Sequence, residues 1–291
     1  MSLINNRRQF LKSASLMASA VLGGAPLMAA NTVQTGEFRG RIRKAVKYHM
    51  ITDKLTTIDK LKMLRDIGFD GVEARAQLDP TKADEIKELA DAREKTDFPI
   101  HGVVNSSNPD IRGAIDQAKM LGANSVLHVV RYDQSIGYLQ NYQETQEIIR
   151  RAIDHAEKNE VYILLENVWA SYLIEPLGMA RFIDEINSPW VMSYFDVGNV
   201  VRWGWPQHWI EVLGQRIKKL DIKEFDLNVA MNEGLRKGFG KPLGEGSIDW
   251  TKVRDELRKI DYRGWATAEV PGGDRAHLAD IAAQMNRVLD L

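Results

Sequence analysis

The sequence of 291 residues contains no cysteine. Disulfide bonds and anchoring through a lipidated cysteine are therefore excluded. No G-x-G-x-x-G pattern follows the first β-rich segment, so dinucleotide binding has no local support. The net charge is −1 and no basic block stands out after residue 44, which argues against nucleic-acid binding through bulk charge.

What the sequence does contain is typical of a globular protein with a large core. Apolar residues make up 44% of the chain and charged residues 27%. No Pro- or Ser-rich linker divides the chain after residue 44. We therefore predict a single domain.

The first 30 residues differ from the rest. Arg7 and Arg8 are followed by Phe10, Leu11 and Lys12, and then by an apolar run of small residues over positions 14–22. This pattern resembles a twin-arginine export signal, while an N-terminal amphipathic helix or anchor is the alternative. The run is too short to indicate a membrane-spanning helix.

This pattern predicts a signal peptide over residues 1–30, a linker over 31–43 and the folded domain over 44–291. We expect a protein that is periplasmic or otherwise exported by the twin-arginine route, with no stable membrane anchor after processing.

From residue 44 onward, short β-rich runs alternate with segments of helical apolar period. Examples are the runs at residues 161–165 and 191–195, separated by a helical pattern at 177–186. Eight such strand–helix units occupy about 245 residues, the usual size of an α/β (β/α)8 TIM barrel. We predict that fold, with an open doubly wound sheet as the alternative.

Four acidic residues each end a predicted strand or lie close to its end: Glu166, Asp196, Asp221 and Glu269. Parallel strands in a closed barrel bring these ends to one edge, so the four carboxylates are expected to converge. Oxygen ligands favour Mg²⁺ or Mn²⁺. The alternative is that each acid caps a helix or pairs with a surface base.

Three segments carry a resemblance to a known family. They are residues 166–169 (ENVW), 194–199 (YFDVGN) and 243–250 (LGEGSIDW). They resemble the xylose-isomerase-like TIM-barrel superfamily of sugar isomerases, epimerases and endonuclease IV relatives. The central third is most similar to the hexulose-phosphate isomerase and L-xylulose/L-ribulose-phosphate 3-epimerase branch, and the resemblance extends over residues 44–290.

The resemblance implies a metal held by Glu, Asp, His and Glu at successive strand ends. Glu166, Asp196 and Glu269 match three of these positions, whereas Asp221 stands where histidine is usual. Asp221 either ligates in an all-oxygen site for Mn²⁺ or Mg²⁺, or marks a weak or lost metal site. The resemblance also implies that Glu166 and Glu269 form the catalytic acid/base pair.

Other residues near the expected edge are candidate substrate contacts. They are His101, His128, Trp169, Asn199, Trp203 and Lys223. The alternative for the two histidines is a satisfied position in the core, and for the tryptophans helix–barrel packing. Residues 226–241, which include Gly234, Gly238 and Gly240, are expected to form a mobile lid.

We therefore predict a metal-dependent sugar isomerase or epimerase that removes a proton α to a carbonyl. One alternative is a lyase or hydratase acting on 3-keto-glycosides through the same site, and another is a non-catalytic sugar-binding protein. DNA cleavage is disfavoured, because that branch uses a trinuclear zinc cluster rich in histidine and this chain has six histidines. The expected partner is a small sugar, and a homo-oligomer is compatible with the sequence. Export argues for a substrate without phosphate.

Overall fold

The computed structural model describes residues 36–169 and 172–291. The predicted export signal and the start of the predicted linker lie outside the described residues. Phe38 is buried and the first strand begins at Ile42, two residues before the predicted start of the domain. The last part of the predicted linker therefore belongs to the barrel.

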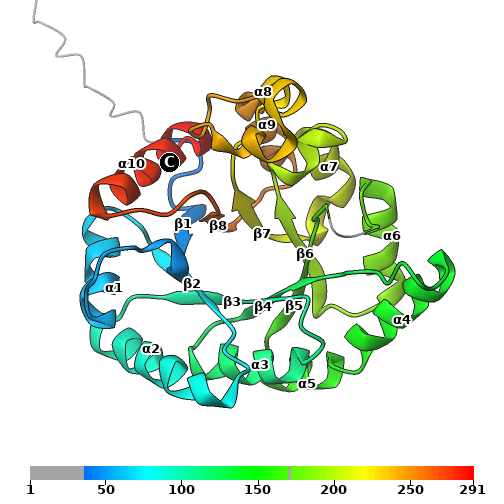
Figure 1. Cartoon of the computed structure of the whole chain (residues 1–291), viewed down its shortest axis with the longest axis horizontal. Helices are drawn as coiled ribbons and strands as arrows, with labels where there is room; N and C mark the ends of the chain where they lie inside the picture. Colours follow the sequence, from blue (N-terminus) through cyan, green and yellow to red (C-terminus); the bar gives the residue numbers. More distant parts are fainter. Residues whose placement is uncertain (1–35, 170–171) are drawn as a thin grey trace, which may run out of the picture. The chain divides into compact units, whose positions relative to one another are not determined.

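Eight parallel strands form a closed barrel in which each strand pairs with its neighbours in sequence and β1 pairs with β8 (Figure 1). The strands are β1 Ile42–Lys47, β2 Gly71–Arg75, β3 Ile100–Ser106, β4 Ser125–Val129, β5 Tyr162–Glu166, β6 Val191–Asp196, β7 Ile217–Ile222 and β8 Gly264–Ala268. The predicted (β/α)8 barrel is confirmed, and the doubly wound alternative is wrong because the sheet has no open edge.

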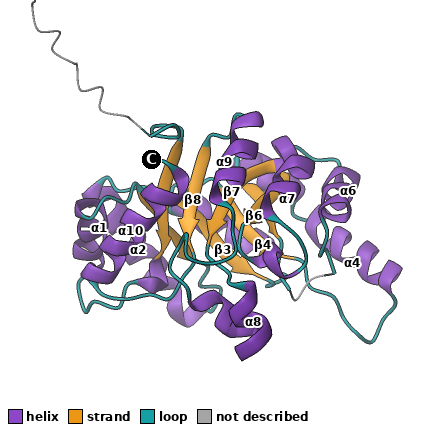
Figure 2. Cartoon of the chain, turned by 90° about the horizontal axis from the view of Figure 1, so that it is seen from above, coloured by secondary structure: helices purple, strands orange, loops and turns teal. Residues whose placement is uncertain are grey.

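Helices surround the strands (Figure 2). They are α1 Thr57–Asp66, α2 Ala83–Thr96, α3 Ile111–Met120, α4 Tyr138–Arg150, α5 Ile153–Asn159, α6 Pro176–Ile186, α7 Pro206–Leu213, α8 Leu227–Glu233, α9 Trp250–Lys259 and α10 Arg275–Leu289. Short 3₁₀ turns are η1 Tyr48–Met50, η2 Pro80–Lys82, η3 Asn199–Arg202, η4 Gly214–Arg216 and η5 Leu235–Gly240.

Local signals explain where several helices begin. The side chains of Asp110, Asp249 and Asp274 each accept a hydrogen bond from a backbone N–H in the first turn of the helix that follows. Pro176 and Pro206 occupy the first position of their helices, where a missing N–H costs nothing.

One helix boundary differs from the prediction. The sequence pattern predicts one helix over residues 142–158, whereas the structure contains α4 and α5 with a turn between them. Arg112 on α3 donates to the Arg151 carbonyl at 2.5 Å, which satisfies a backbone acceptor at this turn.

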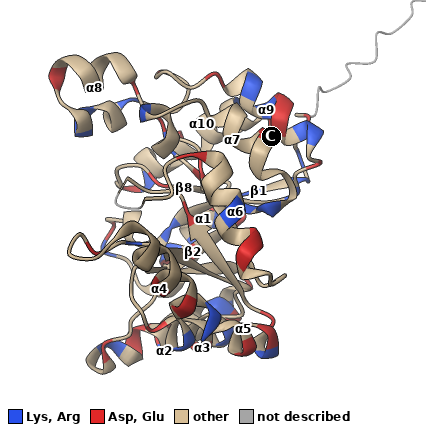
Figure 3. Cartoon of the chain, turned by 90° about the vertical axis from the view of Figure 1, so that its right-hand side faces the viewer, with Lys and Arg blue, Asp and Glu red and all other residues tan. Residues whose placement is uncertain are grey.

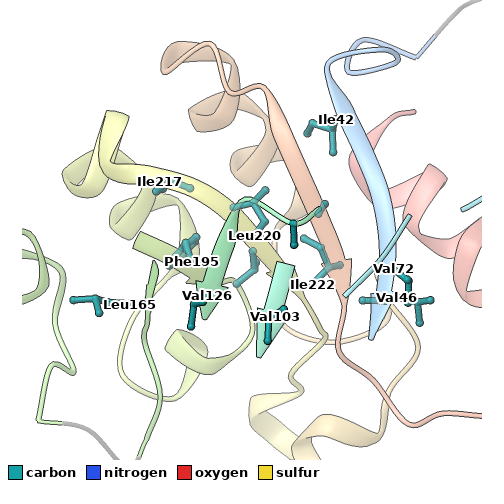
Figure 4. Packing of buried hydrophobic residues seen from close by; sticks show 14 of the residues in the cluster. Ile42, Val46, Val72, Val103, Val126, Leu165, Phe195, Ile217, Leu220 and Ile222 are labelled. Carbon is teal, nitrogen blue, oxygen red and sulfur yellow. The ribbon is translucent and has the colours of Figure 1, made fainter. Parts of the chain in front are cut away.

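Apolar side chains pack on both faces of the strands. Figure 4 shows strand residues of the main core, including Val46, Val126 and Phe195, which pack with the surrounding helices. Leu127, Leu164 and Tyr194 form a second cluster. Because side chains alternate along a strand, this second cluster lies on the opposite face, inside the barrel.

The strand register aligns the carboxyl ends of β5 to β8. Asp196 pairs with Asp221, and Ile222 pairs with Ala268, the residue before Glu269. Glu166 is the last residue of β5, next to Tyr194 of β6. The four predicted acids therefore lie at the same edge of the barrel.

The connection between β7 and α9 carries α8 and η5, which the sequence predicts as a lid. It is anchored by Glu224, a buried carboxylate that accepts hydrogen bonds from the backbone of Gly244 and Ile248 and from the indole of Trp250. Glu224 therefore holds the part of the connection at Gly244–Trp250, and mobility of residues 226–241 stays a prediction.

The outer helices carry basic and acidic segments side by side, for example along α2, α3 and α5 (Figure 3). Among residues 36–169 and 172–291, no helix combines the length and the apolar character needed to span a membrane.

Candidate active site

Four carboxylates meet at the carboxyl edge of the barrel. Each of Glu166, Asp196, Asp221 and Glu269 offers one oxygen atom, and these atoms all lie within 4.8 Å of one another. The Asp196 and Asp221 side chains are fully buried, whereas one third of the Glu269 side chain is exposed. The cluster is therefore open to solvent on the Glu269 side.

The loops after β5 and β6 hold two of these acids in place. Asn167 forms a two-way link to the backbone of Asp196, since its amide donates to the carbonyl and its oxygen accepts from the N–H, both at 2.8 Å. Asp196 in turn accepts the backbone N–H groups of Gly198 and Asn199 at 2.9 and 2.8 Å. The D-V-G-N segment therefore fixes one oxygen of Asp196 by local geometry.

Asn199, which the sequence predicts as a substrate contact, lies inside this network. Its amide nitrogen donates to Glu166 Oε1 at 3.3 Å and to the Asn167 carbonyl at 2.9 Å. Its side-chain oxygen accepts from Lys223 at 3.4 Å. Asn199 thus orients residues of the cluster.

Two lysines reach the carboxylates. Lys223 forms ion pairs with Asp196 (2.7 Å) and Glu269. Lys47 lies 2.8 Å from Asp221, 3.3 Å from Glu269 and 3.4 Å from a fifth carboxylate, Glu73. Glu269 uses a different oxygen for each lysine and connects the two halves of the cluster.

The pKa values of the two predicted catalytic acids move in opposite directions. Burial, together with repulsion from Glu269 and Asp196, raises the pKa of Glu166 to about 8. Burial also acts on Glu269, but the ammonium groups of Lys223 and Lys47 outweigh it and lower the pKa of Glu269 to about 2. One carboxyl group therefore favours the protonated form at neutral pH and the other the ionised form.

The other two acids resemble Glu166. Burial raises the pKa of Asp196 and raises that of Asp221 well above its ordinary value, against the attraction of Lys223 and Lys47 respectively. If all five carboxyl groups of the cluster were ionised, their negative charge would exceed the positive charge of the two ammonium groups.

The residues present fit a divalent cation. Asp221 Oδ1 is buried without a hydrogen-bond partner, and the donor set consists of oxygen atoms. A cation of charge +2 would neutralise much of the remaining excess. Glu166, Asp196, Asp221 and Glu269 are the residues that would hold it.

Aromatic side chains cover one side of the cluster. Trp169 lies 5.1 Å from the Phe239 ring of η5 and 5.6 Å from Phe225, measured between ring centroids. Lys223 Nζ lies 5.6 Å from the Phe239 ring. The segment that contains η5 therefore packs beside both Trp169 and Lys223.

Trp203 lies farther out and is 46% exposed. The guanidinium of Arg202 lies 4.1 Å from the Trp203 ring and 4.9 Å from the Trp169 ring. This stacked group forms an aromatic wall that begins at Trp169 and continues to the surface.

The structure does not bring the two predicted histidines to the cluster. The side chain of His101 is buried against Trp265. Its ring nitrogens form hydrogen bonds with Thr267 Oγ1 and with Nζ of the buried Lys219, both at 3.1 Å. His128 lies on the opposite face of β4 from Leu127 and Val129, which point into the barrel. Burial lowers the pKa of His128 to about 4. Both histidines match the alternative of core positions.

A polar cleft of about 600 Å³ opens at the ends of β2 and β3. Its lining includes Arg75, Lys82, Asn105 and Ser106. Arg75 lies two residues after Glu73 on the same strand, so the two side chains lie on the same face. Glu73 and the four clustered acids are not among the residues that line the cleft.

Two residues of the site, Lys47 and Glu73, are not among those that the sequence predicts. The available signal was a lysine at the end of an apolar strand, in K-A-V-K-Y-H, and an acid at the end of the next strand. A lysine in such a strand must find buried carboxylates or leave the core, and local sequence does not show which.

Fold and site together define a class of protein: a (β/α)8 barrel with a carboxylate-lined site at the carboxyl ends of its strands. Residues 61–290 match the family model described as Xylose isomerase-like TIM barrel, and the chain belongs to that family. The resemblance seen in the sequence is confirmed at this level.

Individual relatives are more distant. The L-ribulose-5-phosphate 3-epimerase of Salmonella paratyphi A is 26% identical over 191 residues, which is 60% of this chain and 62% of the relative. The chain spans between 50% and 62% of the length of the curated relatives it matches.

Solved structures share the fold. A D-allulose 3-epimerase from Methylomonas has a TM-score of 0.68 at 18% identity, over 85% of this chain and 97% of that one. The 3-keto-D-glucoside 4-epimerase of E. coli has a TM-score of 0.68 at 13% identity, over 85% and 98%.

Proposed function

We propose that the protein is a sugar epimerase or isomerase that moves a proton on the carbon next to a carbonyl group, with Mn²⁺ or Mg²⁺ as cofactor. The observation that carries this proposal is the convergence of Glu166, Asp196, Asp221 and Glu269 within 4.8 Å. The family membership and the relatives named as epimerases support it.

Glu166 and Glu269 are suited to share acid and base duties. Glu269 is ionised and partly exposed, and it can accept a proton from a substrate on the open side. Glu166 favours the protonated form in the metal-free site, and a bound ion would displace that proton. Glu166 then becomes the second carboxylate that can take up a proton and return it from its own position.

A bound divalent ion supplies polarisation of the substrate carbonyl, which makes the neighbouring C–H bond more acidic. The chain contributes orientation: Asn199 and Asn167 fix Glu166 and Asp196, and Lys223 adds positive charge beside the position where negative charge develops. The aromatic group of Trp169 and Phe239 limits the access of water on one side.

For the substrate we propose a free sugar, keto-sugar or glycoside. Trp169 offers an apolar face suited to a sugar ring, and the cleft at Arg75 and Asn105 offers polar groups for hydroxyls beyond the reacting carbon. The proposed export also favours a substrate without phosphate, because sugar phosphates are cytoplasmic metabolites.

The experiment is a screen of keto-sugars and 3-keto-glycosides in D₂O with Mn²⁺-loaded protein, followed by mass spectrometry and NMR. An epimerase returns a proton, so its product keeps its connectivity and gains one solvent deuterium. An unsaturated product would identify a lyase that uses the same proton step. Binding of sugar without any deuterium incorporation would overturn the catalytic proposal and leave a sugar-binding protein.

A further inference from the structure

The least expected feature of the site is the ammonium group of Lys47. It lies at the end of β1, and its side chain is 2% exposed. Its nitrogen is within 3.4 Å of carboxylate oxygens of Glu73 on β2, Asp221 on β7 and Glu269, the residue after β8. The Lys47 ammonium is therefore enclosed by carboxylates within the barrel.

The surroundings of Lys47 are those of a cation site. Its ammonium faces three carboxylates, and neither oxygen of Glu73 accepts a hydrogen bond in the described structure, although this side chain is fully buried. A buried carboxylate in this state needs a nearby positive charge. Among the described residues, only Lys47 places an ammonium group within 4.0 Å of a Glu73 oxygen.

Lys223 differs from Lys47 in this respect. Its side chain is 13% exposed and pairs with Asp196 and Glu269 on the open side of the cluster. Lys223 is therefore the more accessible of the two ammonium groups. Lys47 is enclosed by Glu73, Asp221 and the Tyr194 ring 5.7 Å away.

We propose that Lys47 is the built-in cation of a cluster with two cation places, and that it excludes a second divalent ion. One place, at Glu166, Asp196, Glu269 and the free Oδ1 of Asp221, receives the metal. The other, at Glu73, Asp221 and Glu269, is filled permanently by Lys47. This inference rests on the proposed function in that it assumes a divalent ion in the first place.

The chemical consequence concerns the type of reaction. Two metal ions about 3.5–4 Å apart, bridged by a carboxylate, activate water and stabilise a leaving group in phosphoester hydrolysis. Glu269 lies between the two cation places, but the second holds an ammonium that can bind neither water nor a leaving oxygen as a metal does. The arrangement therefore suits proton transfer with one ion and does not suit two-metal hydrolysis.

The test counts Mn²⁺ ions per chain after metal removal and titration, by calorimetry and elemental analysis. We expect Lys47→Ala to bind one ion more than the wild type, because three carboxylates lose their ammonium and space is created between them. The matched control is Lys44→Ala: Lys44 is a buried lysine of the same strand that contacts Asn286 and the Ala282 carbonyl instead of carboxylates. Its ion count should equal that of the wild type.

Two further measurements locate the additional ion. Glu73→Gln in the Lys47→Ala background should return the count to the wild-type value, because it removes one ligand of the second place. Electron paramagnetic resonance of the Mn²⁺-loaded Lys47→Ala protein should show coupling between two neighbouring ions, which an ion bound elsewhere on the surface would not produce.

The outcome is read as a difference between variant and wild type. An equal ion count in Lys47→Ala and wild type overturns the inference. A wild type that binds no ion overturns the metal dependence of the proposed function, while a gain of one ion in the variant still supports the role of Lys47. If Lys47→Ala does not fold, Lys47→Gln replaces it, with the same expected gain, since the amide oxygen is itself a ligand.

Discussion

At the scale of single residues, the site depends on charges that are balanced at short range. Two lysines lower the pKa of Glu269 and hold it ionised, whereas burial and then the neighbouring carboxylates raise the pKa of Glu166, which favours the protonated form. The same residue type therefore takes opposite protonation states within one cluster, and two predictions follow from this difference.

The first prediction concerns Glu269→Gln. Positioned general base catalysis contributes roughly 10²–10⁴-fold, so turnover should fall by about that factor while substrate still binds. Initial rates and KM on the substrate identified by deuterium exchange provide the measurement. Glu245→Gln, an exposed carboxylate in the loop after β7, is the control and should retain wild-type turnover. A loss of less than about threefold in Glu269→Gln would show that another group acts as the base.

The second prediction concerns pH. Glu166 has a pKa of about 8 in the metal-free site, so Mn²⁺ must displace a proton below that pH. Affinity for Mn²⁺ should therefore rise as the pH is increased toward 8, by up to about tenfold per unit for each proton displaced. Calorimetry in buffers of different ionisation enthalpy measures both affinity and proton release.

The variant Glu166→Gln has no proton to release at this position. Its Mn²⁺ affinity should be lower and should depend less steeply on pH than that of the wild type. The raised pKa values of Asp196 and Asp221 act in the same direction and account for a remaining slope. An identical pH dependence in both proteins would contradict the assignment to Glu166.

At the scale of elements, the connection after β7 is held by Glu224. One of its oxygens accepts the N–H groups of Phe225 and Ile248, and the other accepts the Gly244 N–H and the Trp250 indole. Phe225 and Phe239 then extend this anchored segment to Trp169. A buried carboxylate therefore determines where the aromatic cover of the site lies.

We expect Glu224→Gln to lower the free energy of unfolding by about 1–3 kcal/mol, the usual cost of unsatisfied buried polar groups. The physical reason is that the new amide NH₂ would face two N–H donors. Urea denaturation measures the change, and hydrogen exchange should show faster exchange over residues 226–248. The control is Glu233→Gln on exposed α8, which should change stability by less than about 0.5 kcal/mol. Equal midpoints for both variants would remove Glu224 as the anchor.

At the scale of the whole molecule, the proposed active site and the proposed export signal belong to different parts of the sequence. The barrel is described from residue 36, whereas the proposed export signal at residues 1–30 lies outside the described residues. Export through the twin-arginine route is therefore a proposal that the sequence alone supports.

Replacing both arginines, Arg7→Lys together with Arg8→Lys, should leave the protein in the cytoplasm, because the paired arginines are the recognition element of this route. Fractionation of a bacterial host that expresses the full chain provides the measurement. Lys12→Arg, which keeps the pair and the charge, is the control and should be exported. Export of the double variant at the wild-type level would show that the segment uses another route or is no such signal.

The sequence by itself determined the repeating order of strands and helices. Side chains on a strand alternate and those on a helix recur every three to four residues, so the period of apolar positions specifies each element locally. Residues 177–186 illustrate this, since the predicted helix matches α6 closely. Placing acids at strand ends also follows from local pattern, and parallel strands then bring Glu166, Asp196, Asp221 and Glu269 to one edge.

Only the tertiary structure decided which side chains touch across the barrel. Lys47 meets Asp221, which is 174 positions away, through barrel closure and strand register, and no local pattern encodes that contact. Register and strand face likewise turned His128 away from the barrel interior and placed His101 against Lys219. The period of apolar positions specifies which side chains lie on each face of one strand. The closed sheet then decides which charged side chains of distant strands meet in its interior, where an unpaired charge is too costly to remain.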